Sequence, residues 1–146
     1  MAVRETANDL AYEIKDKVVY IAACDPAGDD PNLAAALQNA RQVIVQELFM
    51  TESGKLADVI LPAKPFNERE GTYTSGERRV QRFHPATPTI GDCIADFAIT
   101  ASLAEIAGVD LEGNSASLVF EQLAEVYPSF KGMTYAQLDS PGGQSP

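Results

Sequence analysis

Three short apolar runs in the first half of the chain predict β-strands. They cover residues 18–23, 42–46 and 59–61 and are rich in valine and isoleucine. Turn-forming or polar residues follow each run, as is usual where a strand leaves a sheet. The first run is apolar throughout, which is typical of a strand that is covered on both faces.

Helical patterns precede and separate these runs. Apolar residues recur every three or four positions between residues 4 and 16, which predicts a helix. Asp30 followed by Pro31 predicts the start of a second helix, because a carboxylate can cap it and proline fits its first position. Thr51 is placed to cap a third, short helix. Strands that alternate with helices in this way indicate crossover connections and a parallel sheet.

The second half of the chain opens with residues 62–88, which are rich in proline and glycine. Alternating apolar and polar positions within this segment predict one β-hairpin inside a long loop. Two helices are expected after it, over residues 94–107 and 115–126. The first of them is apolar on most sides, which predicts that it is buried between layers.

These elements predict an α/β fold. We expect residues 1–127 to form a Rossmann-like three-layer domain, with a short parallel sheet and a long loop or hairpin insertion. Residues 128–146 are expected to form a linker toward a domain that is absent from this chain. The linker prediction rests on the proline, glycine and serine of the last residues.

Composition limits the partners and the location of the protein. The 146 residues include 21 Asp and Glu but 11 Lys and Arg, which gives a formal net charge of −10. Such a chain repels the phosphates of nucleic acids and anionic lipids, so neither is expected as a partner. No apolar run approaches the ~20 residues that cross a bilayer, so membrane insertion is not expected. The first residues contain no apolar segment of a signal peptide, so we expect a cytoplasmic location.

Few residues suggest chemistry by themselves. His84 is the single histidine and there is no CxxC pair, so this chain alone cannot build a structural zinc site or a cysteine-ligated cluster. Neither a GxGxxG loop nor a P-loop is present. The loops after the predicted strands carry Asp25, then Gln46 and Glu47, at the edge where open α/β sheets bind ligands. The same residues also suit a polar rim without a ligand, so the spacing leaves the reaction undetermined.

Three arginines form a local basic cluster in this acidic chain. Arg78, Arg79 and Arg82 lie within five consecutive positions. Such a cluster either solvates a hairpin, pairs with the surplus of acidic residues or binds an anionic ligand.

Residues 42–83 resemble a signature of the molybdopterin oxidoreductase family. They contain VIVQELFMTESGKLADVILP and, further on, EREGTYTSGERRVQRF. The flanking segments ACDPAGDDPN and GDCIADFAITASLAEIAG are similar to a loop and a helix of the same family. The resemblance covers nearly the whole chain. It implies a domain that helps to hold a bis(molybdopterin guanine dinucleotide) cofactor carrying molybdenum or tungsten.

The resemblance also implies five cofactor-binding residues. Asp25 stands at the family's Asn in the first loop, and Gln46 and Glu47 stand where the family contacts one dinucleotide. Arg69 matches a basic position and Asp96 a later Asp. A carboxylate can accept two parallel hydrogen bonds from guanine, and a cation suits phosphates. No catalytic residue and no metal ligand are expected within the chain.

Two departures from the family pattern guide the choice of branch. Glu replaces Asp at position 47 and Asp replaces Asn at position 25, which argues against guanine binding. We therefore expect the branch formed by the molybdopterin-oxidoreductase-like large subunit of NADH-quinone oxidoreductase, respiratory complex I. There the domain would be a scaffold of the peripheral arm of a membrane-bound electron-transport complex, and the parent chain would carry iron–sulfur clusters elsewhere.

In that branch the fragment itself would hold no cofactor and show no activity. Its partners would be the other domains of the same large subunit and other subunits of the complex. The alternative is a formate dehydrogenase-type oxidoreductase, in which this domain holds molybdopterin guanine dinucleotide. A third hypothesis is a stand-alone α/β protein that binds a small molecule.

Overall fold

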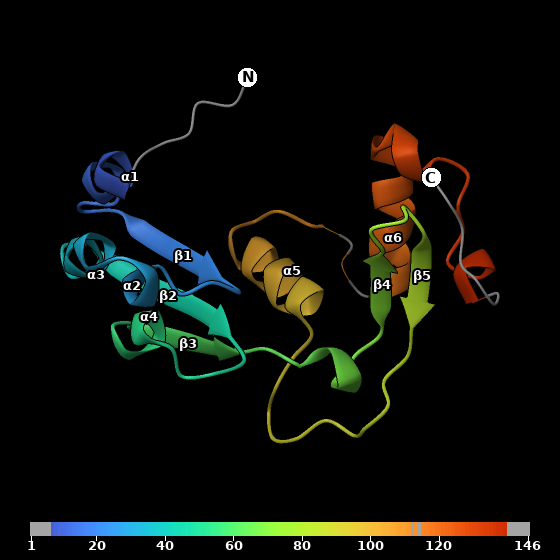
Figure 1. The fold of residues 1–146 in the computed structure, drawn as a ribbon, viewed down its shortest axis with the longest axis horizontal. Helices are drawn as coiled ribbons and strands as arrows, with labels where there is room; N and C mark the ends of the chain where they lie inside the picture. Colours follow the sequence, from blue (N-terminus) through green and yellow to red (C-terminus); the bar gives the residue numbers. More distant parts are fainter. Residues whose placement is uncertain (1–6, 112, 114, 140–146) are drawn as a thin grey trace. The chain divides into compact units, whose positions relative to one another are not determined.

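The computed structural model describes residues 7–111, 113 and 115–139, which divide between Ala63 and Lys64 into two compact units (Figure 1). We call them unit 1 and unit 2 in chain order. No helix among the described residues is long and apolar enough to cross a membrane.

Unit 1 is built on a parallel sheet. Its strands are β1 (Val18–Ala22), β2 (Gln42–Glu47) and β3 (Val59–Pro62), in the order β1-β2-β3. Val18 pairs with Gln42, and Ile44 pairs with Val59. Each strand lies within one residue of a predicted run. The predicted α/β class with a short parallel sheet is confirmed.

Four helices accompany this sheet. They are α1 (Ala7–Glu13), α2 (Pro26–Asp29), α3 (Pro31–Leu37) and α4 (Glu52–Lys55). The predicted caps are confirmed, because Asp30 Oδ1 accepts a hydrogen bond of 2.8 Å from the backbone N–H of Asn32. Thr51 Oγ1 accepts another, of 3.0 Å, from the N–H of Gly54. Helix α2 was not predicted, because its four residues include alanine, glycine and proline in a turn-like order.

The core of unit 1 lies on one face of the sheet. Ile21, Leu37, Val43 and Val45 are buried there with apolar side chains of the helices. The residues of β1 that point the other way remain half-exposed, Val18 at 44% and Tyr20 at 41%. The prediction that this strand is covered on both faces is therefore wrong. Each strand is added on the same side of the one before it, in the order β1-β2-β3. Right-handed connections between such strands place their helices on the same face of the sheet.

Unit 2 contains the predicted hairpin and two longer helices. Its elements are η1 (Phe66–Glu68), β4 (Gly71–Thr74), β5 (Val80–Phe83), α5 (Asp96–Ile106), α6 (Ala116–Val126), η2 (Pro128–Phe130) and η3 (Gln137–Asp139). Strands β4 and β5 pair antiparallel, with Gly71 opposite Phe83. Ser115 caps α6, because its Oγ accepts a hydrogen bond from the N–H of Leu118.

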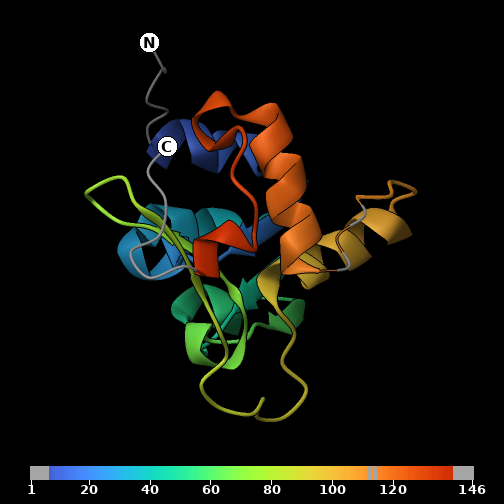
Figure 2. The same cartoon turned by 90° about the vertical axis from the view of Figure 1, so that its right-hand side faces the viewer.

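The core of unit 2 joins the hairpin, α6 and the segment after it (Figure 2). Val80 and Phe120 are buried together with Met133, Tyr135 and Leu138. The segment that the sequence assigns to a linker is thus packed against α6 as far as residue 139. Residues 140–146 lie outside the described residues, and the domain boundary after residue 127 stays a prediction.

Helix α5 is less buried than its sequence suggests. Ile99 is buried, at 6% exposure, whereas Ile106 at the end of the helix is 84% exposed. The prediction that this helix is buried between layers is therefore wrong. Its apolar side chains are spread around the helix, so a single packed stripe cannot cover all of them.

Candidate functional site

The carboxyl edge of the parallel sheet carries three of the five predicted binding residues. Asp25 lies in the loop after β1, and Gln46 and Glu47 end β2. The Asp25 carboxylate accepts four hydrogen bonds within unit 1. Three come from the backbone N–H groups of Ser53 (2.8 Å), Glu52 (3.2 Å) and Gly28 (3.3 Å), and the fourth from the Ser53 hydroxyl (2.7 Å).

One carboxylate therefore caps two helices. Asp25 precedes α2 directly, and Glu52 and Ser53 are the first residues of α4. The hydrogen bond from the Ser53 hydroxyl, with those from the backbone, holds the pKa of Asp25 below its ordinary value of 3.8. Asp25 is thus an ionised structural group whose acceptor positions are largely used within the unit.

Sequence reasoning missed Ser53, which completes this arrangement. Ser53 is 0% exposed, and its Oγ also accepts a hydrogen bond of 3.0 Å from the N–H of Ala27. Asp25 directly before Pro26 is the same capping pattern that located α3, so it was a usable signal for α2. Nothing in the local sequence connects Ser53 with a residue 28 positions earlier.

Gln46 and Glu47 occupy different environments although they are neighbours. Gln46 is 3% exposed, and its Oε1 accepts a hydrogen bond from the Tyr20 hydroxyl. Glu47 is partly exposed, and its Oε1 accepts a hydrogen bond of 2.7 Å from the N–H of Leu48. Its Oε2 makes no hydrogen bond to the residues that the structure describes. Glu47 is therefore the carboxylate at this edge that retains acceptor capacity.

The other two predicted residues lie in unit 2 and form an ion pair. Arg69 Nη1 lies 3.3 Å from Asp96 Oδ2, with 28% and 35% of the two side chains exposed. Asp96 is the first residue of α5, where the helix dipole favours a negative charge. The Nε of Arg69 is buried without a hydrogen bond to the described residues. The structure thus brings Arg69 and Asp96 together within unit 2. The other three predicted residues lie together at one edge of the sheet in unit 1.

A small cavity adjoins Arg69. Its volume is about 140 Å³, and its remaining walls include Phe97 of α5, Phe120 of α6 and Tyr135. Ligand pockets for organic molecules usually measure ~300–1,000 Å³. This cavity is therefore too small to mark the place of a dinucleotide.

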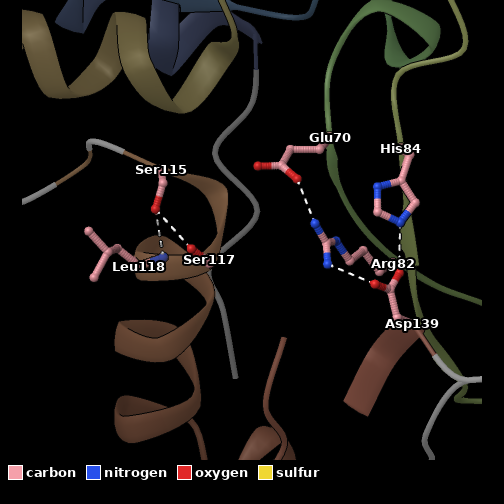
Figure 3. A network of polar contacts seen from close by, with 7 residues as sticks. All are labelled: Glu70, Arg82, His84, Ser115, Ser117, Leu118 and Asp139. Atoms are coloured by element: carbon pink, nitrogen blue, oxygen red, sulfur yellow. Dashed lines mark hydrogen bonds and ion pairs between the residues drawn. The ribbon is translucent and has the colours of Figure 1, made fainter. Parts of the chain in front are cut away.

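A polar network ties the hairpin to the segment after α6 (Figure 3). Arg82 donates from Nη2 to Glu70 Oε2 at 3.0 Å and from Nη1 to Asp139 Oδ2 at 2.9 Å. The guanidinium also lies over the Tyr135 ring, 4.3 Å from its centre. His84 Nε2 lies 2.7 Å from Asp139 Oδ1 and, with the charge of Arg82, holds the pKa of Asp139 below 3.8. Arg82 therefore pairs with acidic residues, which is one of the three alternatives that the sequence left open for the basic cluster.

The described residues contain no group of three or more His, Cys, Asp or Glu side chains that could hold a metal ion. The expectation that the whole chain contributes no metal ligand stays a prediction.

Comparison with known proteins identifies the relatives of this chain. Residues 3–106 match the family model described as molybdopterin oxidoreductase. The chain is 40% identical over 135 residues to F420-dependent formate dehydrogenase 2 subunit alpha of Methanococcus maripaludis, which covers 89% of this chain and 20% of that protein. It is 33% identical over 129 residues to formate dehydrogenase H of Escherichia coli, which covers 86% of this chain and 18% of that protein. The chain thus spans about a fifth of the length of these curated relatives.

These relatives correct the predicted branch. The expectation of a subunit of NADH-quinone oxidoreductase, with its scaffold role in complex I, is wrong, because these relatives are a formate dehydrogenase alpha subunit and a formate dehydrogenase. That expectation rested on Asp25 and Glu47, which depart from the family pattern. The structure shows that the Asp25 carboxylate accepts hydrogen bonds at the first turns of α2 and α4. Its identity therefore reflects the local structure and carries little information on the electron partner.

The match over residues 3–106 includes all five predicted binding residues and extends from unit 1 into unit 2 as far as the end of α5. At least 33% identity to both relatives accompanies it over most of the chain. The chain belongs to the molybdopterin oxidoreductase family.

Proposed function

We propose that this chain is part of the α subunit of a formate dehydrogenase-type oxidoreductase and helps to hold its molybdopterin guanine dinucleotide cofactor. The observation that carries the proposal is the similarity to formate dehydrogenases over 86–89% of the chain. The chain corresponds to 18–20% of those proteins, so catalysis would need the remainder of the subunit.

The residues at the sheet edge fit a guanine group in a specific way. The free Oε2 and the Oε1 of Glu47 are the acceptors that can face the two N–H donors of guanine. Asp25 is committed to α2 and α4, so we assign it the role of shaping the loop that borders the nucleotide. Gln46 is held by Tyr20 and would support the position of Glu47.

Arg69 and Asp96 would serve the anionic part of the cofactor. Arg69 supplies a planar cation whose Nη1 is already oriented by Asp96, and such a group suits phosphate oxygens. When bound, the molybdopterin group would supply the two-electron chemistry of formate oxidation. The residues of this chain would bind and orient the dinucleotide. The other domains of the subunit, with iron–sulfur clusters among them, are the expected partners.

Titration with GDP tests the assignment of Glu47. We expect GDP to shift the backbone amide signals of residues 46–50 in NMR spectra of this chain. Glu47→Gln should weaken binding about tenfold or more, because an amide cannot accept both guanine hydrogen bonds. Glu125→Gln is the matched control, since Glu125 is exposed on α6 and its change also removes one negative charge. Equal losses in both variants would contradict the role of Glu47.

A second measurement tests the proposal at the level of the whole protein. Purified full-length subunit should contain molybdenum or tungsten and release about two GMP equivalents for each metal atom on hydrolysis. Iron without pterin or GMP would reject the cofactor-holding function. A positive result with no effect of Glu47→Gln would reject the assigned residue alone.

A further inference from the structure

The loop between β2 and α4 exposes three consecutive large apolar side chains. Leu48, Phe49 and Met50 are 43%, 78% and 62% exposed. They follow Glu47 directly and precede the α4 cap, Thr51, at the carboxyl edge of the sheet. Single exposed apolar residues are common on protein surfaces, whereas a contiguous group of them beside polar residues is typical of a binding surface. This composition favours a binding role for the loop.

Backbone hydrogen bonds hold this loop in place. The N–H of Leu48 donates to Glu47 Oε1 at 2.7 Å, and the N–H of Thr51 donates to Phe49 O at 3.0 Å. Thr51 then caps α4, whose first turn is also bound by Asp25. The exposed ring thus stands on a hydrogen-bonded backbone, which lowers the entropic cost of binding a ligand.

Phe49 differs from Met50 in having no partner for its side chain. A Cβ added to Gly54 would lie 3.3 Å from Met50 Sδ, so the Met50 side chain lies against α4. The Phe49 ring takes part in none of the contacts between aromatic rings found among the described residues. It is also the most exposed of the six phenylalanines. The ring is therefore available to a planar ligand.

The neighbouring carboxylate indicates which planar ligand this is. Phe49 lies two residues after Glu47, so their Cα atoms are at most about 7 Å apart. A base that presents its edge to the Glu47 carboxylate can therefore bring its face to the ring, and bases stack favourably on aromatic rings. A protein surface that covered Phe49 would also bury the Glu47 carboxylate, which then needs hydrogen-bond donors. Guanine supplies both the donors and the aromatic face.

We propose that Phe49 stacks on the guanine base whose N–H groups Glu47 binds, an inference that rests on the function proposed above. The two residues contribute in different ways. Every base has an aromatic face, so stacking on Phe49 raises the affinity without selecting the base. The two acceptor oxygens of Glu47 match the paired N–H donors of guanine, and adenine lacks this pair. Phe49 therefore sets the affinity for purine nucleotides, and Glu47 sets the preference for guanine.

The binding of GDP and ADP to wild type and three variants tests this assignment. Phe49→Leu should weaken the binding of both nucleotides about fivefold or more, because it removes the ring and keeps an apolar side chain. The ratio of the two dissociation constants should stay unchanged. Glu47→Gln should instead lower the preference for GDP. Phe66→Leu is the matched control and should change neither quantity, since Phe66 is 60% exposed and belongs to unit 2.

NMR spectra supply a direct readout of the contact. Protons of bound GDP should show nuclear Overhauser effects to the Phe49 ring, which an indirect structural role would not produce, and weaker binding in Phe49→Leu without these effects would overturn the proposal. Full GDP affinity in Phe49→Leu, with a loss in Glu47→Gln, would overturn the stacking and leave the proposed function intact. A loss in Phe49→Leu with an unchanged preference in Glu47→Gln would support the stacking and reject the role of Glu47. No binding of GDP to wild type would overturn both.

Discussion

Replacing Leu138 by alanine tests whether the segment after α6 belongs to the folded domain. Leu138 is 2% exposed and lies in the core cluster with Val80, Phe120 and Tyr135. A linker residue could be shortened with little effect. A core residue could not, because the neighbouring side chains would lose their contacts.

The expected magnitude follows from the burial. The substitution removes three buried carbon groups, each of which contributes ~0.8 kcal/mol, for a transfer loss of about 2.4 kcal/mol. Incomplete collapse of the resulting cavity should raise the loss in unfolding free energy to ~3–4 kcal/mol. For a domain of this size, such a loss lowers the melting temperature by more than about 10 °C.

Urea unfolding of wild type, Leu138→Ala and Leu118→Ala checks this prediction. Leu118 lies on α6 and is 39% exposed, so its truncation should cost ~1 kcal/mol or less. The difference in unfolding free energy between the two variants is the decisive quantity. If both variants lose the same small amount, Leu138 is not part of a cooperative core and residues 128–139 behave as a linker.

The remaining predictions concern acid stability and the hairpin. The pKa values of Asp25 and Asp139 are lowered in the folded chain, so their stabilising contribution is present above about pH 4 and is lost as the pH falls further. Between pH 6 and pH 2, the free energy of unfolding should therefore fall less steeply in Asp25→Asn than in wild type. Equal pH dependence of the unfolding free energy in the two proteins would contradict this. At Gly71 an added Cβ would lie 2.8 Å from Phe83 Cζ, so Gly71→Ala should lower the unfolding free energy by ~1–3 kcal/mol. Phe83→Leu in the same chain should recover part of that loss, and additive effects in a double-mutant cycle would refute the steric explanation.

The sequence predicted those parts of the fold that depend on local signals. Valine and isoleucine at consecutive positions located β2, and Asp30 with Pro31 located α3, because strand and cap preferences act over a few residues. Local composition also led to the linker prediction for residues 128–139, because proline, glycine and serine are common in the segment from residue 128 onward. Only contacts with the hairpin and α6 explain why Leu138 is buried, and the sequence carries no local sign of them.

The candidate site shows the same division. Its place at the carboxyl edge of the sheet was predicted from the parallel strands and the loops that follow them. The cofactor-binding role of Glu47 and Arg69 was predicted from the resemblance to the family. The contact of Asp25 with α4 was not predicted, because its partner Ser53 lies 28 residues further along the chain. The ion pair of Arg69 with Asp96 joins two segments on either side of the hairpin in the same way. Residue spacing and composition therefore could not predict which distant residues these polar groups contact.

The shared cap at Asp25 has a consequence for motion at the sheet edge. Because one carboxylate holds the first turns of α2 and α4, the loop after β1 and the loop after β2 cannot open independently. Displacing either loop breaks charge-assisted hydrogen bonds in both. The two loops therefore move as one element. A ligand that contacts only the Glu47 side would also slow hydrogen exchange at Ala27 and Gly28 of α2, which it does not touch.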